Sequence, residues 1–293
     1  MNTKPPTNAD PLKGKRVIVT GAGNGLGEAY ALYLGAHGAH VVVNDIDGKR
    51  ADEVASEIVA AGGDARSIGC SVTDWNTAGQ IVELCITEFG AVDGLVNNAA
   101  VHSVAEPWLE GETLIRSMIN VNLVGAVFVG IRAMSHMVKQ RSGSIVNITS
   151  TTQFGLPRRA VYGATKGALA SLTYSWAIDL ALYGVRVNAY SPQAQTAMVT
   201  EKPFAGALPT PADNAPLVGY LLSDLSLDLN GQVFARRGDK IVVMTHPALT
   251  EFSGSGEAQT VEALHEQLGP VFRSGLQPLG DPRAQKTPDS PDK

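Results

Sequence analysis

The regular alternation of short apolar runs with longer stretches of helical spacing limits the fold most. Runs rich in β-branched residues predict buried strands over 15–20, 40–44, 65–69, 92–96, 144–148 and 185–189. The stretches between them predict helices over 25–37, 47–61, 74–89, 112–137 and 161–182. Strands that alternate with such helices pair in parallel, with helices on both faces. We therefore expect an α/β fold, a doubly wound parallel sheet in a single domain.

The rest of the chain predicts the last elements of this domain and flexible segments at both termini. We expect an irregular segment over 193–211, a helix over 215–222, strands over 232–235 and 241–244, and a C-terminal helix containing Val261, Leu264 and Leu268. Residues 1–12 are polar and predict a flexible extension, residues 13–250 predict one domain, and residues 251–293 predict that helix followed by a proline-rich disordered tail.

Composition narrows the class of protein. The net charge of −5 comes without a basic run that would suggest nucleic acid or an anionic membrane as a partner. We find neither a signal peptide nor a run that approaches the length of a membrane-spanning helix. The two cysteines, Cys70 and Cys85, lack metal-ligand spacing, so we predict no metal site and interpret them as buried thiols in a reducing compartment. A cytoplasmic protein is expected.

The loop T-G-A-G-N-G-L-G at 20–27 joins the first predicted strand to the first helix. Glycines there allow a tight turn and a close approach to a pyrophosphate, which then lies at the helix N-terminus. A glycine-rich loop alone is weak evidence, because many turns use glycine. Its position between a strand and a helix favours a dinucleotide site.

Asp45 ends the second predicted strand, 20 positions after Gly25. A carboxylate there accepts hydrogen bonds from an adenosine ribose and repels a 2′-phosphate. Neither Asn24 nor Ile46, the positions in the loop and after the acid, is basic. The pattern favours NAD over NADP; the alternative for Asp45 is an ordinary turn residue at a strand end.

Tyr162 and Lys166 stand four residues apart in a predicted helix and would project side by side. A phenol with a pKa of about 10 is a poor base at neutral pH, and a nearby ammonium lowers that pKa. Ser150, just upstream, offers a hydroxyl that can hold a substrate oxygen. Together these groups could remove the proton of a secondary alcohol, although such a Tyr-Lys pair alone is common by chance.

Taken together, the motifs are specific, and the chain resembles the short-chain dehydrogenase/reductase family over residues 13–245. The matching segments are TGAGNGLG at 20–27, NNAA at 97–100, NVNLVG at 120–125, SIVNITS at 144–150, YGATK at 162–166 and VRVNAYSP at 185–192. The likeness is greatest to bacterial members related to hydroxyacyl-CoA and hydroxysteroid dehydrogenases. The resemblance implies a Rossmann-type sheet and a nicotinamide cofactor, here NAD.

The resemblance also implies the site residues. The catalytic set would be Asn122, Ser150, Tyr162 and Lys166. The cofactor would be bound by Gly21, Asn24, Gly25, Leu26, Gly27, Asp45, Ile46, Ser71, Val72, Asn98, Ala99, Ala100, Tyr162, Lys166 and Pro192. Tyr162 would act as acid and base, Lys166 would also bind the nicotinamide ribose, and Ser150 would orient the substrate. Asn122 would hold a water that relays protons, or serve the structure alone.

Several positions depart from the family pattern. Ala100 and Gln193 replace usual glycines, and Ser71 replaces an aspartate that often contacts adenine. Ser150 precedes Tyr162 by 12 residues, one fewer than is commonest, so Thr149 and Thr151 stay open as the hydroxyl donor.

The function we expect is hydride transfer between NAD and a secondary alcohol or ketone of the hydroxysteroid, cyclic alcohol or 3-hydroxyacyl type. The alternatives are an NADPH-dependent 3-oxoacyl or ketone reductase and a non-catalytic dinucleotide sensor. Family members commonly pair their two long helices, so the resemblance also implies a homo-oligomer, a dimer or a tetramer. The small-molecule substrate itself is not identified by the sequence.

Overall fold

The computed structural model describes residues 10–194, 208–248, 260–263, 265, 266 and 270. The chain divides into two units, Met1–Met244 and Thr245–Lys293, and all strands belong to the first. In the second, residues 261–263, 265 and 266 are helical, within the predicted C-terminal helix. The predicted flexible N-terminus up to residue 9 and the tail beyond Ser274 lie outside the described residues, and the domain boundaries stay predictions.

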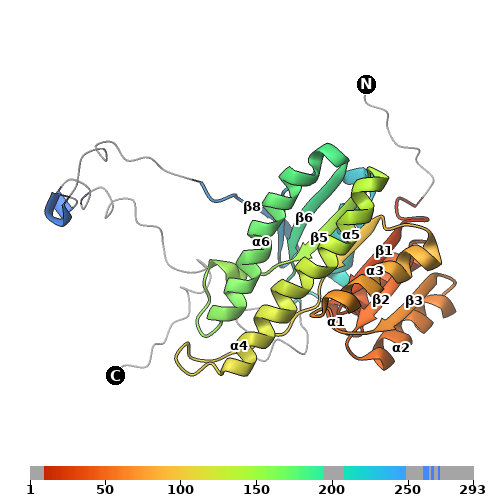
Figure 1. Ribbon diagram of the computed structural model, residues 1–293, viewed down its shortest axis with the longest axis horizontal. Helices are drawn as coiled ribbons and strands as arrows, with labels where there is room; N and C mark the ends of the chain where they lie inside the picture. The colour runs from red at the N-terminus through yellow and green to blue at the C-terminus, as the bar shows by residue number, and fades with distance from the viewer. Residues whose placement is uncertain (1–9, 195–207, 249–259, 264, 267–269, 271–293) are drawn as a thin grey trace. The chain divides into compact units, whose positions relative to one another are not determined.

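The first unit is built on a sheet of eight strands in the order β3-β2-β1-β4-β5-β6-β7-β8. The strands are β1 Arg16–Thr20, β2 His40–Asp45, β3 Asp64–Gly69, β4 Gly94–Asn97, β5 Gly143–Ile148, β6 Val185–Ser191, β7 Val233–Arg237 and β8 Lys240–Met244. Pairing is parallel from β3 to β7, and β8 returns antiparallel beside β7. The predicted Rossmann-type α/β fold is confirmed (Figure 1).

Seven α-helices accompany the sheet in the described part of the chain. They are α1 Gly25–Ala36, α2 Gly48–Ala60, α3 Trp75–Phe89, α4 Glu112–Met118, α5 Ala126–Gln140, α6 Ala160–Leu180 and α7 Ala215–Leu222. Their starts follow local chemistry: Asp47 and Asp74 accept hydrogen bonds from first-turn backbone N–H groups of α2 and α3. Gly90, at φ 88°, ends α3 in the left-handed conformation that glycine adopts easily.

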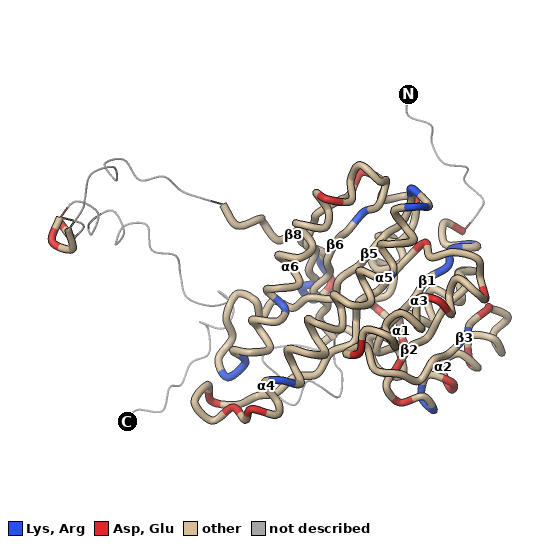
Figure 2. The backbone as a smooth tube through the Cα atoms, viewed as in Figure 1, with Lys and Arg blue, Asp and Glu red and all other residues tan. Residues whose placement is uncertain are grey.

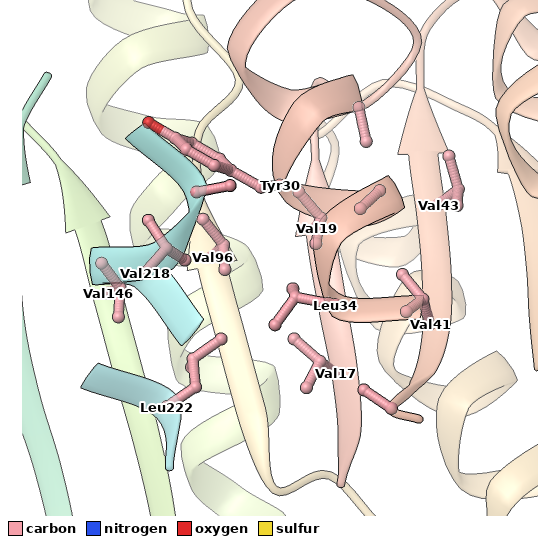
Figure 3. Packing of buried hydrophobic residues seen from close by; sticks show 14 of the residues in the cluster. Val17, Val19, Tyr30, Leu34, Val41, Val43, Val96, Val146, Val218 and Leu222 are labelled. Atoms are coloured by element: carbon pink, nitrogen blue, oxygen red, sulfur yellow. The ribbon is translucent and has the colours of Figure 1, made fainter. Parts of the chain in front are cut away.

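The hydrophobic core lies in two layers, one on each face of the sheet. Alternate strand residues serve opposite faces: Val17 and Val19 pack with α1, α2 and α7 (Figure 3), whereas Ile18 packs with α3 and α5. Because both faces are covered, central strands contain continuous apolar runs, such as Val17–Val19 in β1 and Val41–Val43 in β2, instead of alternating. This is why short continuous apolar runs could be recognised as strands.

The helix predicted over 112–137 is present as one continuous helical run, Glu112–Gln140, but its hydrogen bonding is not regular throughout. Between α4 and α5 the backbone forms a wide π-helical turn, Ile119–Gly125. This turn contains Asn122, which is completely buried, and Gly125, where a Cβ would lie 2.4 Å from Val72 Cγ2. Such turns recur at functional sites because they redirect side chains that a regular helix would place elsewhere.

By length and composition, the helical run Glu112–Gln140 could cross a membrane, contrary to the prediction that no run would reach that length. One such helix is weak evidence, because the core helix of a soluble protein passes the same test. Val129, Ala133 and Met137 of α5 are fully buried in the core against the sheet. One face of α5 therefore belongs to the core.

Candidate active site

The carboxyl ends of the parallel strands bring the predicted site residues to one edge of the sheet. Loop 21–24 follows β1, Asp45 ends β2, Asn98 follows β4, Ser150 follows β5 and Pro192 follows β6. The chain order reverses between β1 and β4, the switch point at which ligands bind in such sheets. Residues far apart in the sequence therefore share one edge.

The loop after β1 is held by backbone packing that leaves no room for side chains. A Cβ on Gly21, at φ 61°, would lie 2.7 Å from Ala99 Cα, and one on Gly27 would lie 2.1 Å from the Gly21 carbonyl oxygen. Asn98 braces the loop, because its Nδ2 donates to the Thr20 and Gly21 carbonyls at 2.9 Å. The loop geometry is thus fixed from two strands.

The same loop leaves open space at its tip. Gly25 also has φ 61°, yet a Cβ there would meet no described atom within 4 Å. The N-cap of α1, Asn24, makes no side-chain capping bond, and Glu28 accepts only from the Gly25 N–H. A helix N-terminus beside open glycines fits the pyrophosphate of a dinucleotide.

Asp45 is nearly buried, with 9% of its surface exposed, whereas Ile46 is 78% exposed. Its Oδ2 accepts the Gly23 N–H at 2.9 Å and its Oδ1 accepts the Asp47 N–H at 3.0 Å. Asp45 therefore does act as a turn residue at a strand end, the alternative to cofactor binding considered from the sequence. Because each carboxylate oxygen has two lone pairs, both can still accept from ribose hydroxyls.

The two predicted residues after β3 are occupied by local contacts. The Ser71 hydroxyl lies 2.9 Å from the Thr73 hydroxyl and also accepts the Thr73 N–H at 3.2 Å. Val72 is buried in the core against Gly125. Ser71 therefore first stabilises the turn into α3.

Ser150 and Tyr162 are brought together by the short 3₁₀ segment Thr151–Phe154 and the start of α6. Ser150 caps that segment by accepting the Thr152 N–H at 3.2 Å, and its side chain hydrogen-bonds to Tyr162. Of the two alternatives, the Thr149 hydroxyl is buried with no hydrogen-bond partner among the described residues. No described hydrogen bond joins the Thr151 hydroxyl to Tyr162. Ser150 is the hydroxyl that reaches the phenol.

Burial raises the pKa of the Tyr162 phenol to about 12, while the hydrogen bond with Ser150 and the charge of Arg159 lower it. We expected the Lys166 ammonium to lower this pKa, but in the structure described the net shift is upward, because burial is the largest effect. The Lys166 Nζ lies 5.7 Å from the centre of the Tyr162 ring. Desolvation of the phenolate outweighs the charges around it.

Lys166 is 2% exposed, and its Nζ donates to the Ile148 carbonyl at 2.7 Å. Burial lowers its pKa to about 7. Among the described residues, no carboxylate pairs with it. A buried lysine of this kind titrates near neutral pH, so small changes in its surroundings decide whether it is charged.

The Asn122 side chain ties the π-helical turn to its neighbours. Its Oδ1 accepts the Val101 N–H at 2.8 Å, and its Nδ2 donates to the Val101 carbonyl at 2.9 Å and to the Thr165 hydroxyl at 3.1 Å. That hydroxyl donates to the Tyr162 carbonyl at 2.8 Å. Asn122 thereby connects the loop after β4 to helix α6.

After β6, Gln193 connects the segment that begins with Pro192 to two other elements. Its Oε1 accepts the Gly238 N–H at 2.7 Å in the β7–β8 turn, and its carbonyl accepts from Asn214 Nδ2 at 3.2 Å. Glycine, the usual residue here, would lack the first contact. The segment after β6 offers Met198, Phe204 and Leu208 as candidate substrate-facing residues, and the first two of these lie outside the described residues.

Sequence reasoning missed three positioning residues, Thr20, Gly23 and Thr165. The Thr20 hydroxyl accepts the N–H groups of Asn98 and Ala99 at 3.1 and 3.2 Å, which joins the ends of β1 and β4. All three lie within the matched segments 20–27 and 162–166, but their partners Asn98, Asp45 and Asn122 are distant in the sequence, so local spacing did not reveal these roles.

Within the described ranges, no group of three or more His, Cys, Asp or Glu side chains could hold a metal ion.

Known proteins of one family are similar to this chain over most of its length. The family profile described as "short chain dehydrogenase" matches residues 15–204. The 3-oxoacyl-[acyl-carrier-protein] reductase FabG of Thermotoga maritima is 32% identical over 79% of this chain and 99% of its own. The cis-4-hydroxycyclohexanecarboxylate dehydrogenase of Sinomonas cyclohexanicum is 33% identical over 75% of this chain and 94% of its own.

A solved structure is similar over most of the chain. A short chain dehydrogenase from Mycobacterium avium superimposes with a TM-score of 0.80 at 34% identity, covering 90% of this chain and 94% of that one. The chain belongs to the short-chain dehydrogenase family, and it is an oxidoreductase of that family.

Proposed function

We propose that the protein transfers a hydride between NAD and a secondary alcohol or its ketone, with Tyr162 as the acid and base. The observation that carries the proposal is the Tyr162 phenol, hydrogen-bonded to Ser150 one helical turn before the buried Lys166. A phenol, a hydroxyl and an ammonium group in this arrangement suit proton transfer at an alcohol oxygen.

The chain's own residues divide the work. Bound nicotinamide supplies the hydride acceptor or donor. Loop 21–27 and the N-terminus of α1 would hold the pyrophosphate, and Asp45 the adenosine ribose. Ser150 would hold the substrate oxygen against Tyr162, which takes the hydroxyl proton in oxidation and returns it in reduction. Lys166 would stabilise the phenolate and bind the second ribose, and Asn122 would order a water for the proton relay.

The pKa shifts give the proposal a direction with pH. With its pKa raised to about 12, Tyr162 is protonated at neutral pH and ready to donate to a ketone oxygen. Oxidation needs the phenolate, whose fraction grows as pH rises. We therefore expect reduction to be favoured near pH 7 and oxidation to quicken toward alkaline pH.

An NADPH-dependent 3-oxoacyl reductase is the second candidate, in line with the FabG relative. The observation that favours it is Arg50 in the first turn of α2: a Cβ on Gly23 would lie 2.8 Å from Arg50 Cβ and 2.9 Å from Asp45 Oδ2. The Cβ of the basic residue Arg50 thus lies near Asp45, the residue proposed to bind the adenosine ribose. Its guanidinium instead lies 3.4 Å from Asp47, which favours NAD.

The test is cofactor reduction at 340 nm with secondary alcohols of four kinds: steroid, cyclic, aromatic and 3-hydroxyacyl. Each is assayed with NAD and with NADP, at pH 7 and pH 9. We expect turnover of at least one class with NAD, faster at the higher pH. Turnover with NADP alone would support the second candidate. Ser150→Ala, assayed in parallel, is expected to lose on the order of 100-fold in kcat.

We also propose a cytoplasmic homo-oligomer, a dimer or tetramer built on α5 and α6. Ile131 of α5 is 40% exposed. Ile178 of α6 is 76% exposed, and Leu182, which follows α6, is 82% exposed. Apolar side chains left in water on these helices support burial against a second copy. Light scattering at micromolar concentration tests it, and a monomer would contradict it.

A further inference from the structure

Two neighbouring arginines precede the catalytic helix, and they differ in their surroundings. Arg158 is exposed, in the left-handed conformation at φ 63°, and its guanidinium lies 3.6 Å from Glu106. Its carbonyl accepts the Ala105 N–H at 3.0 Å. The basic segment before α6 and the acidic loop before α4 are therefore neighbours (Figure 2). Arg158 has a structural task, which is to join these loops.

Arg159 has no such partner. It is half-buried at the N-cap of α6, three residues before Tyr162, and within the described ranges no carboxylate pairs with its guanidinium. Its positive charge nevertheless reaches the phenol, because it lowers the pKa of Tyr162. A half-buried arginine whose charge no described carboxylate balances suits an anionic ligand, since its planar fork matches a carboxylate.

The place of Arg159 separates this anion from the dinucleotide phosphates. The glycine loop follows β1, whereas Arg159 lies beyond the end of β5, and β4 stands between these strands in the sheet. On the Tyr162 side, the His102 ring packs edge-on at 5.8 Å between ring centres. Two elements therefore contribute groups near the phenol: Arg159 from the start of α6, whose charge reaches it, and His102 from the loop after β4, whose ring packs against it.

We propose that Arg159 binds a carboxylate of the substrate, so that the alcohol oxidised at Tyr162 is a hydroxy acid. This inference rests on the proposed dehydrogenase function and narrows its substrate class. The charged end of the molecule is held at the start of α6 while its hydroxyl lies between Ser150 and Tyr162. Neutral alcohols of the same skeleton lose this contact.

The experiment compares hydroxy acids with their methyl esters, in which the carboxylate charge is removed. A series with two to five carbons between hydroxyl and carboxylate is assayed with wild type, Arg159→Gln, Arg159→Lys and the control Arg158→Gln. We expect Arg159→Gln to lower kcat/KM for the best acid by on the order of 100-fold, mainly through KM, and for esters by less than about threefold. Arg159→Lys is expected to recover part of the loss, and Arg158→Gln to stay within about threefold for both.

Saturation-transfer NMR with butyrate and butyramide gives a readout that needs neither cofactor nor turnover. We expect contact with butyrate alone, lost in Arg159→Gln and kept in Arg158→Gln. If wild type oxidises esters or coenzyme A thioesters as well as the acids, and Arg159→Gln leaves the ratio unchanged, the carboxylate proposal is overturned while the dehydrogenase stands. If wild type oxidises no alcohol, the proposed function fails, and the NMR result alone decides whether Arg159 binds an anion.

Discussion

The half of the candidate site that we propose holds the nucleotide, on β1, β2 and β4, differs in construction from the proposed catalytic half on β5 and α6. In the first half, polar side chains are satisfied by backbone groups: Asp45 by two N–H groups, Asn98 by two carbonyls. In the second half, Tyr162 and Lys166 are enclosed at a cost, since burial moves both pKa values toward the neutral forms. The first half is thus a hydrogen-bonded frame, whereas the second contains buried groups with perturbed pKa values, which are common at functional sites.

The first half predicts the largest loss. Gly27→Ala places a Cβ 2.1 Å from the Gly21 carbonyl oxygen, a backbone atom that cannot move alone. We expect this overpacking to lower the free energy of unfolding by about 3 kcal/mol. We also expect the variant to bind NAD more weakly, because the loop that would hold the pyrophosphate is displaced. Urea unfolding and calorimetry measure both.

The control for that variant is Gly79→Ala in α3. There the new Cβ meets only the flexible end of Arg132 at 3.2 Å, so helix propensity dominates. We expect a change between zero and a gain of about 1 kcal/mol. Equal losses in the two variants would contradict the difference between backbone and side-chain contacts.

The catalytic half predicts an effect of opposite sign. Because burial lowers the pKa of Lys166 from 10.5 to about 7, the folded state disfavours its charge. That penalty is complete below pH 7 and disappears as pH rises from 7 to 10.5, where the unfolded chain binds the extra proton. Lys166→Met is expected to stabilise the cofactor-free protein by about 2 kcal/mol at pH 6, after the lost bond to Ile148 is counted.

Urea titrations at pH 6, 8 and 10 follow the difference between variant and wild type, which is expected to shrink as pH rises. Lys139→Met, at an exposed position of α5, serves as the control and is expected to stay within about 0.5 kcal/mol. A Lys166→Met protein less stable than wild type at pH 6 would mean that the buried ammonium is well compensated.

The smallest effect concerns the choice of cofactor. Asp45→Asn removes the charge that repels a 2′-phosphate while keeping an oxygen for the Gly23 N–H. We expect the NADP-to-NAD ratio of kcat/KM to rise about tenfold, and Asp52→Asn, farther along α2, to leave it unchanged. An unchanged ratio in Asp45→Asn would remove the main argument for NAD.

The two halves were also predictable to different degrees. The strands and helices around loop 20–27 follow from local apolar patterns, and their observed bounds differ from the predicted ones by one or two residues. The antiparallel return of β8 and the π-helical turn around Asn122 depend on contacts between distant residues, such as Val72 with Gly125. The spacing of residues within a short segment cannot predict such contacts.

The candidate site shows the same limit. The spacing of Tyr162 and Lys166 predicted that they share a helix face, but not that Lys166 would donate to Ile148 or that burial would outweigh its charge at the phenol. Ser150 was left open against two threonines, because only the fold decides which hydroxyl points at Tyr162. Arg159 gave no signal in the sequence, since its lack of a partner is visible only in three dimensions.

The most direct test of the proton-transfer claim is Tyr162→Phe, with NADH binding followed by fluorescence and turnover followed at 340 nm. The variant removes one hydroxyl and leaves the glycine loop and Asp45 untouched. We expect NADH affinity within about threefold of wild type and a fall in kcat on the order of 1,000-fold, the scale of a lost acid–base group. Full turnover in the variant would contradict the assignment of Tyr162 as the group that moves the proton.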